Sequence, residues 1–123
     1  MTFQDLLAFK KSFALAMQIF EITKSFPKEE TYSLTDQIRR SSRSVPVTIA
    51  EAYRKRNYPK YFYSKLTDSD AENSETQVWL DFAISCQYIS LEIHEKLISE
   101  SIEIGKLINY MLLNPEKFGV KKE

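Results

Sequence analysis

The sequence predicts an all-α protein, an antiparallel up-down-up-down four-helix bundle formed by a single domain over residues 1–123. Three observations lead to this prediction. Four long segments repeat apolar residues at three- and four-residue steps, which is the spacing of one helix face. Glycine is almost absent, with two residues in 123. The links between the four segments are short, which favours antiparallel neighbours in a bundle.

The first two predicted helices cover about residues 3–25 and 34–56. On the first, one face carries Leu6, Phe9, Phe13, Met17 and Phe20. Pro27 ends it, because the residue before a proline disfavours the helical region. The second begins after Ser33, a residue type that commonly caps helices. Its apolar positions continue on both sides of Pro46, so we expect a kink there and not an end.

The third and fourth predicted helices cover about residues 59–87 and 90–113. Pro59 fits the first position of a helix, where its missing N–H is not needed. The inner face of the third helix contains a polar stripe that needs hydrogen-bond partners if it is buried, and Gln37 and Gln77 are candidates to join it. This stripe consists of Ser69, Asn73 and Thr76. Residues 114–123 are expected to form a frayed tail.

Charge is unevenly distributed along the chain, although its seventeen basic and seventeen acidic residues cancel. Between Gln37 and Lys65 lie eight basic residues and one acidic residue. Between Leu66 and Ile104 lie nine acidic residues and one basic residue. Electrostatic contact with nucleic acid must therefore be local, because the net charge gives no general attraction.

A series of short motifs occurs in a characteristic order. The motifs are Phe26-Pro27, Glu30, Tyr32, Leu34, Gln37, Arg39-Arg40, Ser44-Val45, Ile49-Ala50-Glu51 and Glu75-Thr76-Gln77. In this order the chain resembles, over about residues 3–113, a bacterial four-helix-bundle family encoded in intervening sequences of large-subunit ribosomal RNA genes. That family is related to the accessory variability determinant of diversity-generating retroelements. Its common Asn-Ile-Ala-Glu-Gly differs here at the first and last positions, Thr48 and Ala52.

The resemblance implies a four-helix protomer assembled into a ring-like homopentamer. For the retroelement relatives it also implies a basic surface that engages nucleic acid, and a nucleic-acid-handling enzyme, a reverse transcriptase, as a partner. It implies the fold more directly than the function, since the biochemical role of the family is poorly defined.

The link between the second and third helices is the strongest candidate for contact with RNA or DNA. Its cations can neutralise phosphates, and its tyrosines can stack on unpaired bases. The predicted contact residues are Arg54, Lys55, Arg56, Lys60, Lys65, Tyr58 and Tyr61. A second interpretation fits the same residues: the cations form a solvated corner, and the aromatic side chains belong to the core or to a subunit interface.

Three further arginines lie on the second helix, and three acidic residues share one face of the third. The arginines are Arg39, Arg40 and Arg43, and the acidic residues are Asp68, Glu72 and Glu75. The planar guanidinium group suits bidentate pairing with a carboxylate. We therefore predict salt bridges within or between subunits, with phosphate contact as the alternative. Glu51 is predicted to pair with Lys55 or Arg54 of its own helix, or with an interfacial arginine.

We expect no enzymatic activity, cofactor or metal. A di-iron bundle needs Glu-x-x-His pairs, but Leu91 stands three residues before His94. No glycine-rich phosphate loop is present. One cysteine, Cys86, and an N-terminal segment with charges at Asp5 and Lys10 lead us to expect a cytoplasmic protein without membrane contact.

Overall fold

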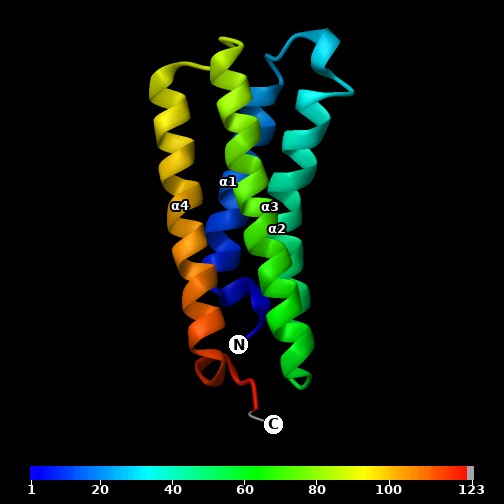
Figure 1. Ribbon diagram of the computed structural model, residues 1–123, viewed down its shortest axis with the longest axis vertical. Helices are drawn as coiled ribbons and strands as arrows, with labels where there is room; N and C mark the ends of the chain where they lie inside the picture. Colours follow the sequence, from blue (N-terminus) through cyan, green and yellow to red (C-terminus); the bar gives the residue numbers. More distant parts are fainter. Residues whose placement is uncertain (122–123) are drawn as a thin grey trace.

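The computed structural model describes residues 1–121 and is built from helices alone over that range. Its four long helices are α1 (Leu7–Thr23), α2 (Leu34–Arg54), α3 (Pro59–Ser85) and α4 (Leu91–Leu113). They alternate in direction and lie side by side (Figure 1). The prediction of an all-α, up-down-up-down four-helix bundle is confirmed.

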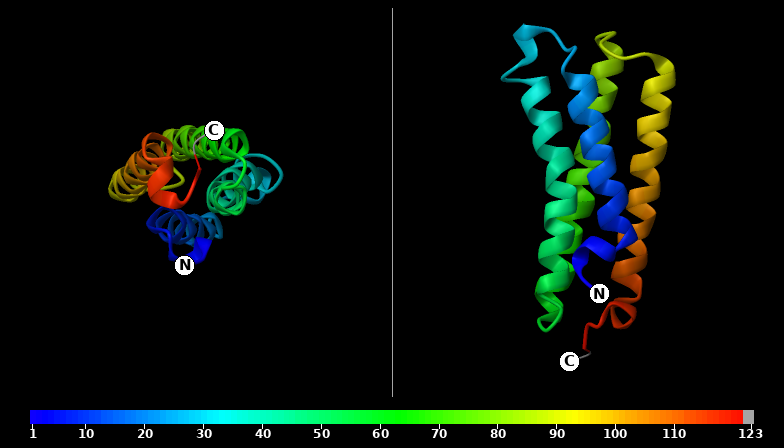
Figure 2. Two further views of the ribbon diagram at one scale, coloured as in Figure 1. Left: turned by 90° about the horizontal axis from the view of Figure 1, so that it is seen from below. Right: turned by 180° about the vertical axis from the view of Figure 1, so that it is seen from behind.

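The helices form a closed arrangement in which α2 packs against α1 and α3, and α4 packs against the same two helices. Seen along the bundle, the four helices surround one core (Figure 2). The α2–α3 turn, the N-terminus and the C-terminal segment up to residue 121 lie at the end drawn lowest in Figure 1, here called the lower end. The α1–α2 and α3–α4 links lie at the upper end.

The core contains one set of buried aliphatic side chains contributed by all four long helices. They are Ile19, Ile38, Ile49, Leu66, Leu80, Leu97, Ile104 and Ile108. On α1, however, the buried face also includes Ala8, Ser12 and Leu15, and it is not the face identified from the sequence. Phe13 is 52% exposed and Met17 is 47% exposed. α1 is apolar on more than one side, so periodicity alone did not identify the side that packs inward.

The first two long helices begin in different ways. The expected first helix is interrupted at Leu6, and residues Phe3–Asp5 form a separate 3-10 turn, η1. At the start of α2, Ser33 makes no cap bond of its own. Instead, the Glu30 carboxylate accepts hydrogen bonds from the Leu34 N–H and the Ser33 hydroxyl. α2 then continues through Pro46, as expected.

The polar stripe on α3 is buried and its members have partners. Ser69 donates to the Val45 carbonyl at 3.0 Å, and the Thr76 hydroxyl lies 2.9 Å from that of Ser41. Both bonds join α3 to the part of α2 that precedes Pro46. On the side of α3 that faces α4, Asn73 makes hydrogen bonds with Ser101. The small serines allow the helix backbones to approach closely.

The C-terminal segment is ordered against the bundle, so the expectation of a frayed tail is wrong for residues 114–121. Pro115–Phe118 forms a 3-10 turn, η3, and Gly119 adopts a left-handed conformation with φ of 84°. This geometry places Val120, only 7% exposed, in the hydrophobic core. The last two residues of the predicted tail lie outside the described range. Within residues 1–121, no helix has both the length and the apolar character to cross a bilayer.

Candidate nucleic-acid interface

The α2–α3 turn forms a corner at the lower end (Figure 1). Its exposed side chains include Arg54, Lys55, Tyr58 and Tyr61. α2 ends at Arg54, and the Lys55 N–H closes its last turn through the carbonyls of Glu51 and Ala52. Pro59 then begins α3. We call the nucleic-acid contact residues predicted from the sequence the basic corner. They are Arg54, Lys55, Arg56, Lys60, Lys65, Tyr58 and Tyr61.

Tyr58 and Tyr61 lie next to each other on the surface of the corner. Each is 58% exposed, and their ring centroids are 6.2 Å apart with the rings at 90°. The Lys55 ammonium lies 5.7 Å from the Tyr58 centroid and 5.6 Å from the Tyr61 centroid. An exposed cation over two accessible rings offers a charge for a phosphate and π-faces for a base.

Arg56 differs from its neighbours because its side chain is engaged within the protein. Its Nε donates to the Tyr53 carbonyl at 2.8 Å, and its guanidinium lies 3.7 Å from the Tyr53 ring centroid. It also lies against Gly119 of the C-terminal segment. Arg56 is therefore positioned to hold the C-terminal segment against the bundle.

Lys65 is the one member of the basic corner with a carboxylate within 4.0 Å among residues 1–121. Its Nζ lies 3.6 Å from Oε2 of Glu51. Glu51 thus pairs across helices, and not with Lys55 or Arg54 as its spacing suggested. Arg54, Lys55 and Lys60 are exposed and have no such partner in the described chain, which leaves their charges available to a ligand.

The C-terminal segment adds cations to the lower end that the sequence analysis did not include. Lys117 donates to the Tyr110 hydroxyl at 2.9 Å, and this hydrogen bond raises the pKa of Lys117. Lys121 and Lys60 both line a pocket at this end. The signal that could have revealed them is the pattern Phe118-Gly119-Val120, in which a glycine stands between two apolar residues.

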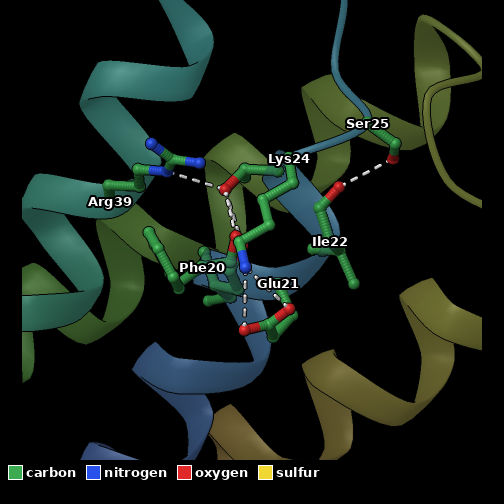
Figure 3. A network of polar contacts seen from close by, with 8 residues as sticks. Phe20, Glu21, Ile22, Lys24, Ser25 and Arg39 are labelled. Carbon is green, nitrogen blue, oxygen red and sulfur yellow. Dashed lines mark hydrogen bonds and ion pairs between the residues drawn. The ribbon is translucent and has the colours of Figure 1, made fainter.

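Two of the three arginines in the first half of α2, Arg39 and Arg43, contact α1 in the described chain. Arg39 donates from Nε to the Thr23 hydroxyl at 2.8 Å, reaching toward the last turn of α1 (Figure 3). The Arg39 and Arg43 guanidinium groups lie 4.9 Å and 5.5 Å from the Phe20 ring centroid. Arg40 lies 3.9 Å from Asp36 of its own helix.

The acidic residues of α3 therefore form no salt bridge with these arginines among residues 1–121. Glu75 accepts a hydrogen bond from Trp79 at 3.2 Å. Burial raises the pKa of Glu72, and the charges of Glu75 and Asp68 add to this shift, while Arg40 opposes it. The described protomer leaves the carboxylates of Asp68 and Glu72 without a basic partner in contact distance.

A second surface feature is an apolar groove of about 670 Å³ between α1 and α2. Its floor includes Phe9, Phe13, Met17 and Val47. Arg43 and Arg54 also line it. The exposed apolar side chains that the sequence analysis placed on one face of the first helix form much of this groove.

The described residues offer no group of three or more histidine, cysteine or acidic side chains arranged to hold a metal ion. His94 is paired with Asp81, with Nε2 2.8 Å from Oδ1. Cys86 is exposed.

The fold and the lower-end surface define a helical bundle protein with a basic, tyrosine-rich corner. A family model described as "23S rRNA-intervening sequence protein" matches residues 4–110. This chain belongs to that family. It is also similar to the crystal structure of a protein of unknown function from the S23 ribosomal protein family of Bacteroides thetaiotaomicron VPI-5482. The two are 30% identical, the match covers 89% of this chain and 97% of that one, and the TM-score is 0.79. Comparison with curated proteins gives no significant match.

Proposed function

We propose that this protein is a non-enzymatic, cytoplasmic nucleic-acid-binding protein that contacts RNA through the basic corner. The observation that carries the proposal is the cluster of Lys55, Tyr58 and Tyr61, in which an ammonium lies over two exposed rings. The name of the family, which refers to a ribosomal RNA intervening sequence, favours RNA over DNA as the first ligand to test.

Binding would combine two contributions. Each phosphate neutralised by lysine or arginine releases counterions, which gives affinity without sequence preference. Stacking of unpaired bases on tyrosine contributes about 1–3 kcal/mol per base and also tolerates any sequence. The corner thus suits a ligand with accessible bases and a continuous phosphate backbone, and it contains no motif that reads base edges.

The test is fluorescence anisotropy of a labelled single-stranded RNA at low salt. A triple variant with Arg54→Ala, Lys55→Ala and Lys60→Ala should weaken binding at least tenfold, because three unpaired cations are removed. Arg56 is left intact because it packs on Tyr53. A matched control removes three exposed lysines of the upper end: Lys24→Ala, Lys28→Ala and Lys96→Ala. Equal affinity of both triple variants, or no binding by the wild type, refutes the proposal.

The apolar groove between α1 and α2 supports a second candidate function, self-association into a ring such as the homopentamer that the family resemblance implies. The groove exposes Phe13, Met17 and Val47 to solvent in the protomer. Its basic residues Arg43 and Arg54 complement the carboxylates of α3 that have no basic partner. In such an assembly the acidic residues Asp68, Glu72 and Glu75 would pair with arginines of a neighbouring copy.

A ring would also repeat the basic corner around one assembly, so a modest contact in each subunit would add up. It could serve as a scaffold for a nucleic-acid-handling enzyme, such as the reverse transcriptase that the resemblance implies. Sedimentation analysis tests self-association. Met17→Glu places a charge on an already exposed position and should give monomers, whereas Tyr32→Ala at the upper end should not. A wild-type monomer at micromolar concentration contradicts this second function.

A further inference from the structure

A pocket of about 420 Å³ opens at the lower end, between the first turn of α3 and the C-terminal segment. Its inner wall consists of Phe62, Leu112 and Val120, and the exposed ring of Tyr63 lines it as well. Two cations, Lys60 and Lys121, also line the pocket. The volume falls within the range of about 300–1,000 Å³ that small-ligand pockets occupy.

The chemistry of this pocket matches a flat apolar group attached to an anion. Aliphatic and aromatic walls suit the faces of a nucleobase, and Tyr63 offers a ring for stacking. Lys60 and Lys121 can bind the attached phosphate. The start of α3 adds to this positive potential, because its N-cap residue Tyr58 provides no side-chain cap for the first N–H groups.

The pocket is continuous with the basic corner. They meet at Lys60, which belongs to both and lies one turn before Tyr63 on α3, whereas Tyr61 and Tyr63 are two residues apart and point to different sides of the helix. A nucleic-acid strand bound along the corner would therefore pass the mouth of the pocket. A duplex keeps its bases stacked and paired, so only an unpaired nucleotide can present a base to such a pocket.

We infer that this pocket holds one unpaired nucleotide of the bound strand, with the base between Tyr63 and the Phe62–Val120 wall and the phosphate between Lys60 and Lys121. The inference rests on the proposed nucleic-acid-binding function and deepens it by naming single-stranded nucleic acid as the ligand. It also gives the C-terminal segment a role in binding, since Val120 and Lys121 complete the pocket.

Methyl NMR of the full chain tests the inference directly. The probes are a single-stranded uridine RNA, the same strand in a duplex with adenosine RNA, and inorganic polyphosphate. The single strand should shift the methyl resonances of Leu112 and Val120, because a base ring enters the pocket. Backbone amide resonances of Lys55 and Tyr58, recorded on the same sample, report on the exposed corner, and duplex and polyphosphate should shift these amides but leave the Leu112 and Val120 methyl resonances in place. Methyl shifts of equal size with polyphosphate would show an anion effect and overturn the inference.

A pair of tyrosine variants gives a second measurement. Tyr63→Ala should weaken single-strand binding about five- to tenfold, the loss expected for one stacked base, and leave polyphosphate binding unchanged. Tyr32→Ala, at a 94% exposed tyrosine of the upper end, is the matched control and should bind like the wild type.

Failure of the inference can be distinguished from failure of the proposed function. If single-stranded RNA binds through the basic corner but the Leu112 and Val120 methyl resonances do not move, the function holds and the pocket inference is wrong. The same conclusion follows if Tyr63→Ala binds like the wild type. If single-stranded RNA does not bind at all, the proposed function fails and the pocket inference fails with it.

Discussion

The guanidinium of Arg56 lies 3.7 Å from the centroid of the Tyr53 ring, and its Nε donates to the carbonyl of the same residue. This relationship separates Arg56 from Arg54 and Lys55, which stand beside it in the sequence but are exposed. Arg56 also touches Gly119, so the contact links the α2–α3 turn to the C-terminal segment. A run of three basic residues thus divides into two cations open to a ligand and one that is part of the folded structure.

Replacement of Arg56 by alanine should lower the free energy of unfolding by about 1–2 kcal/mol, because a cation–π contact and a hydrogen bond are lost together. Urea denaturation followed by circular dichroism measures this change. Arg54→Ala, which removes an exposed neighbour, should stay within about 0.5 kcal/mol of the wild type. Equal stability of the two variants would contradict the structural role of Arg56.

Replacing each of the two glycines by alanine should change the stability of the protein in opposite directions. Gly119→Ala should destabilise the protein by about 1–2 kcal/mol, because its φ of 84° is left-handed and disfavours a side chain. Gly105 lies within α4, where an added Cβ would meet Asn73 at an ordinary distance of 3.5 Å. Gly105→Ala should therefore stabilise by about 0.5–1 kcal/mol. Thermal unfolding of both variants checks the prediction, which is wrong if they shift in the same direction.

A buried polar cluster joins α3 to α4. Asn73 donates from Nδ2 to the Ser101 carbonyl at 2.9 Å, and the Ser101 hydroxyl donates to Oδ1 of Asn73 at 2.9 Å. Gln77 donates to the same hydroxyl. Ser101→Ala should reduce stability by about 1–3 kcal/mol, because it leaves the buried Asn73 oxygen without its donor. Ser99→Ala, an exposed serine of the same helix, is the control, and an equally small effect of both substitutions would contradict the account.

Glu30 and Tyr88 couple the α1–α2 link to the α3–α4 link through a 2.8 Å hydrogen bond from the Tyr88 hydroxyl to Oε2 of Glu30. Hydrogen bonds from Ser33, Tyr88 and the Leu34 N–H lower the pKa of Glu30 below its ordinary 4.5. The resulting stabilisation is present above pH 4.5 and is lost as the pH falls through the folded-state value. The bond to Glu30 raises the pKa of Tyr88 from 10.0 to about 12.

At alkaline pH, Tyr88 ionises at a lower pH in the unfolded state than in the folded state. Its contribution to stability is therefore full below pH 10 and is lost as the pH rises toward 12. The wild type should therefore lose stability between pH 10 and pH 12. Tyr88→Phe should lose less stability over the same range, because phenylalanine has no hydroxyl to ionise. Chemical denaturation at a series of pH values measures both the loss of stability at acid pH, which is linked to Glu30, and the loss at alkaline pH, which is linked to Tyr88. Parallel pH profiles of the wild type and Tyr88→Phe would contradict the coupling.

The sequence was sufficient to predict the number, order and approximate bounds of the long helices, because apolar periodicity and the prolines report directly on them. It was also sufficient to identify the buried stripe on α3, since polar residues interrupt an apolar face at Ser69, Asn73 and Thr76. These are local properties of the chain. They do not depend on how one helix is rotated against another.

Contacts across helices were harder to predict because they depend on helix rotation. α1 is apolar on two sides, and only packing decides that Ile19 is buried while Phe13 is exposed. Glu51 was expected to pair with Lys55 or Arg54 of its own helix or with an interfacial arginine, and the residue within contact distance is Lys65 of α3. The C-terminal segment was predicted to be a frayed tail because it follows the end of the last helix, and its packing depends on the left-handed turn at Gly119.

The salt dependence of RNA binding tests the central claim most directly. The logarithm of the binding constant of the wild type for single-stranded RNA should fall linearly with the logarithm of salt concentration. The variant lacking the side chains of Arg54, Lys55 and Lys60 should show a slope smaller by about two, since each lost phosphate contact removes about 0.7. An equal slope for wild type and variant, or binding that does not respond to salt, would contradict the account.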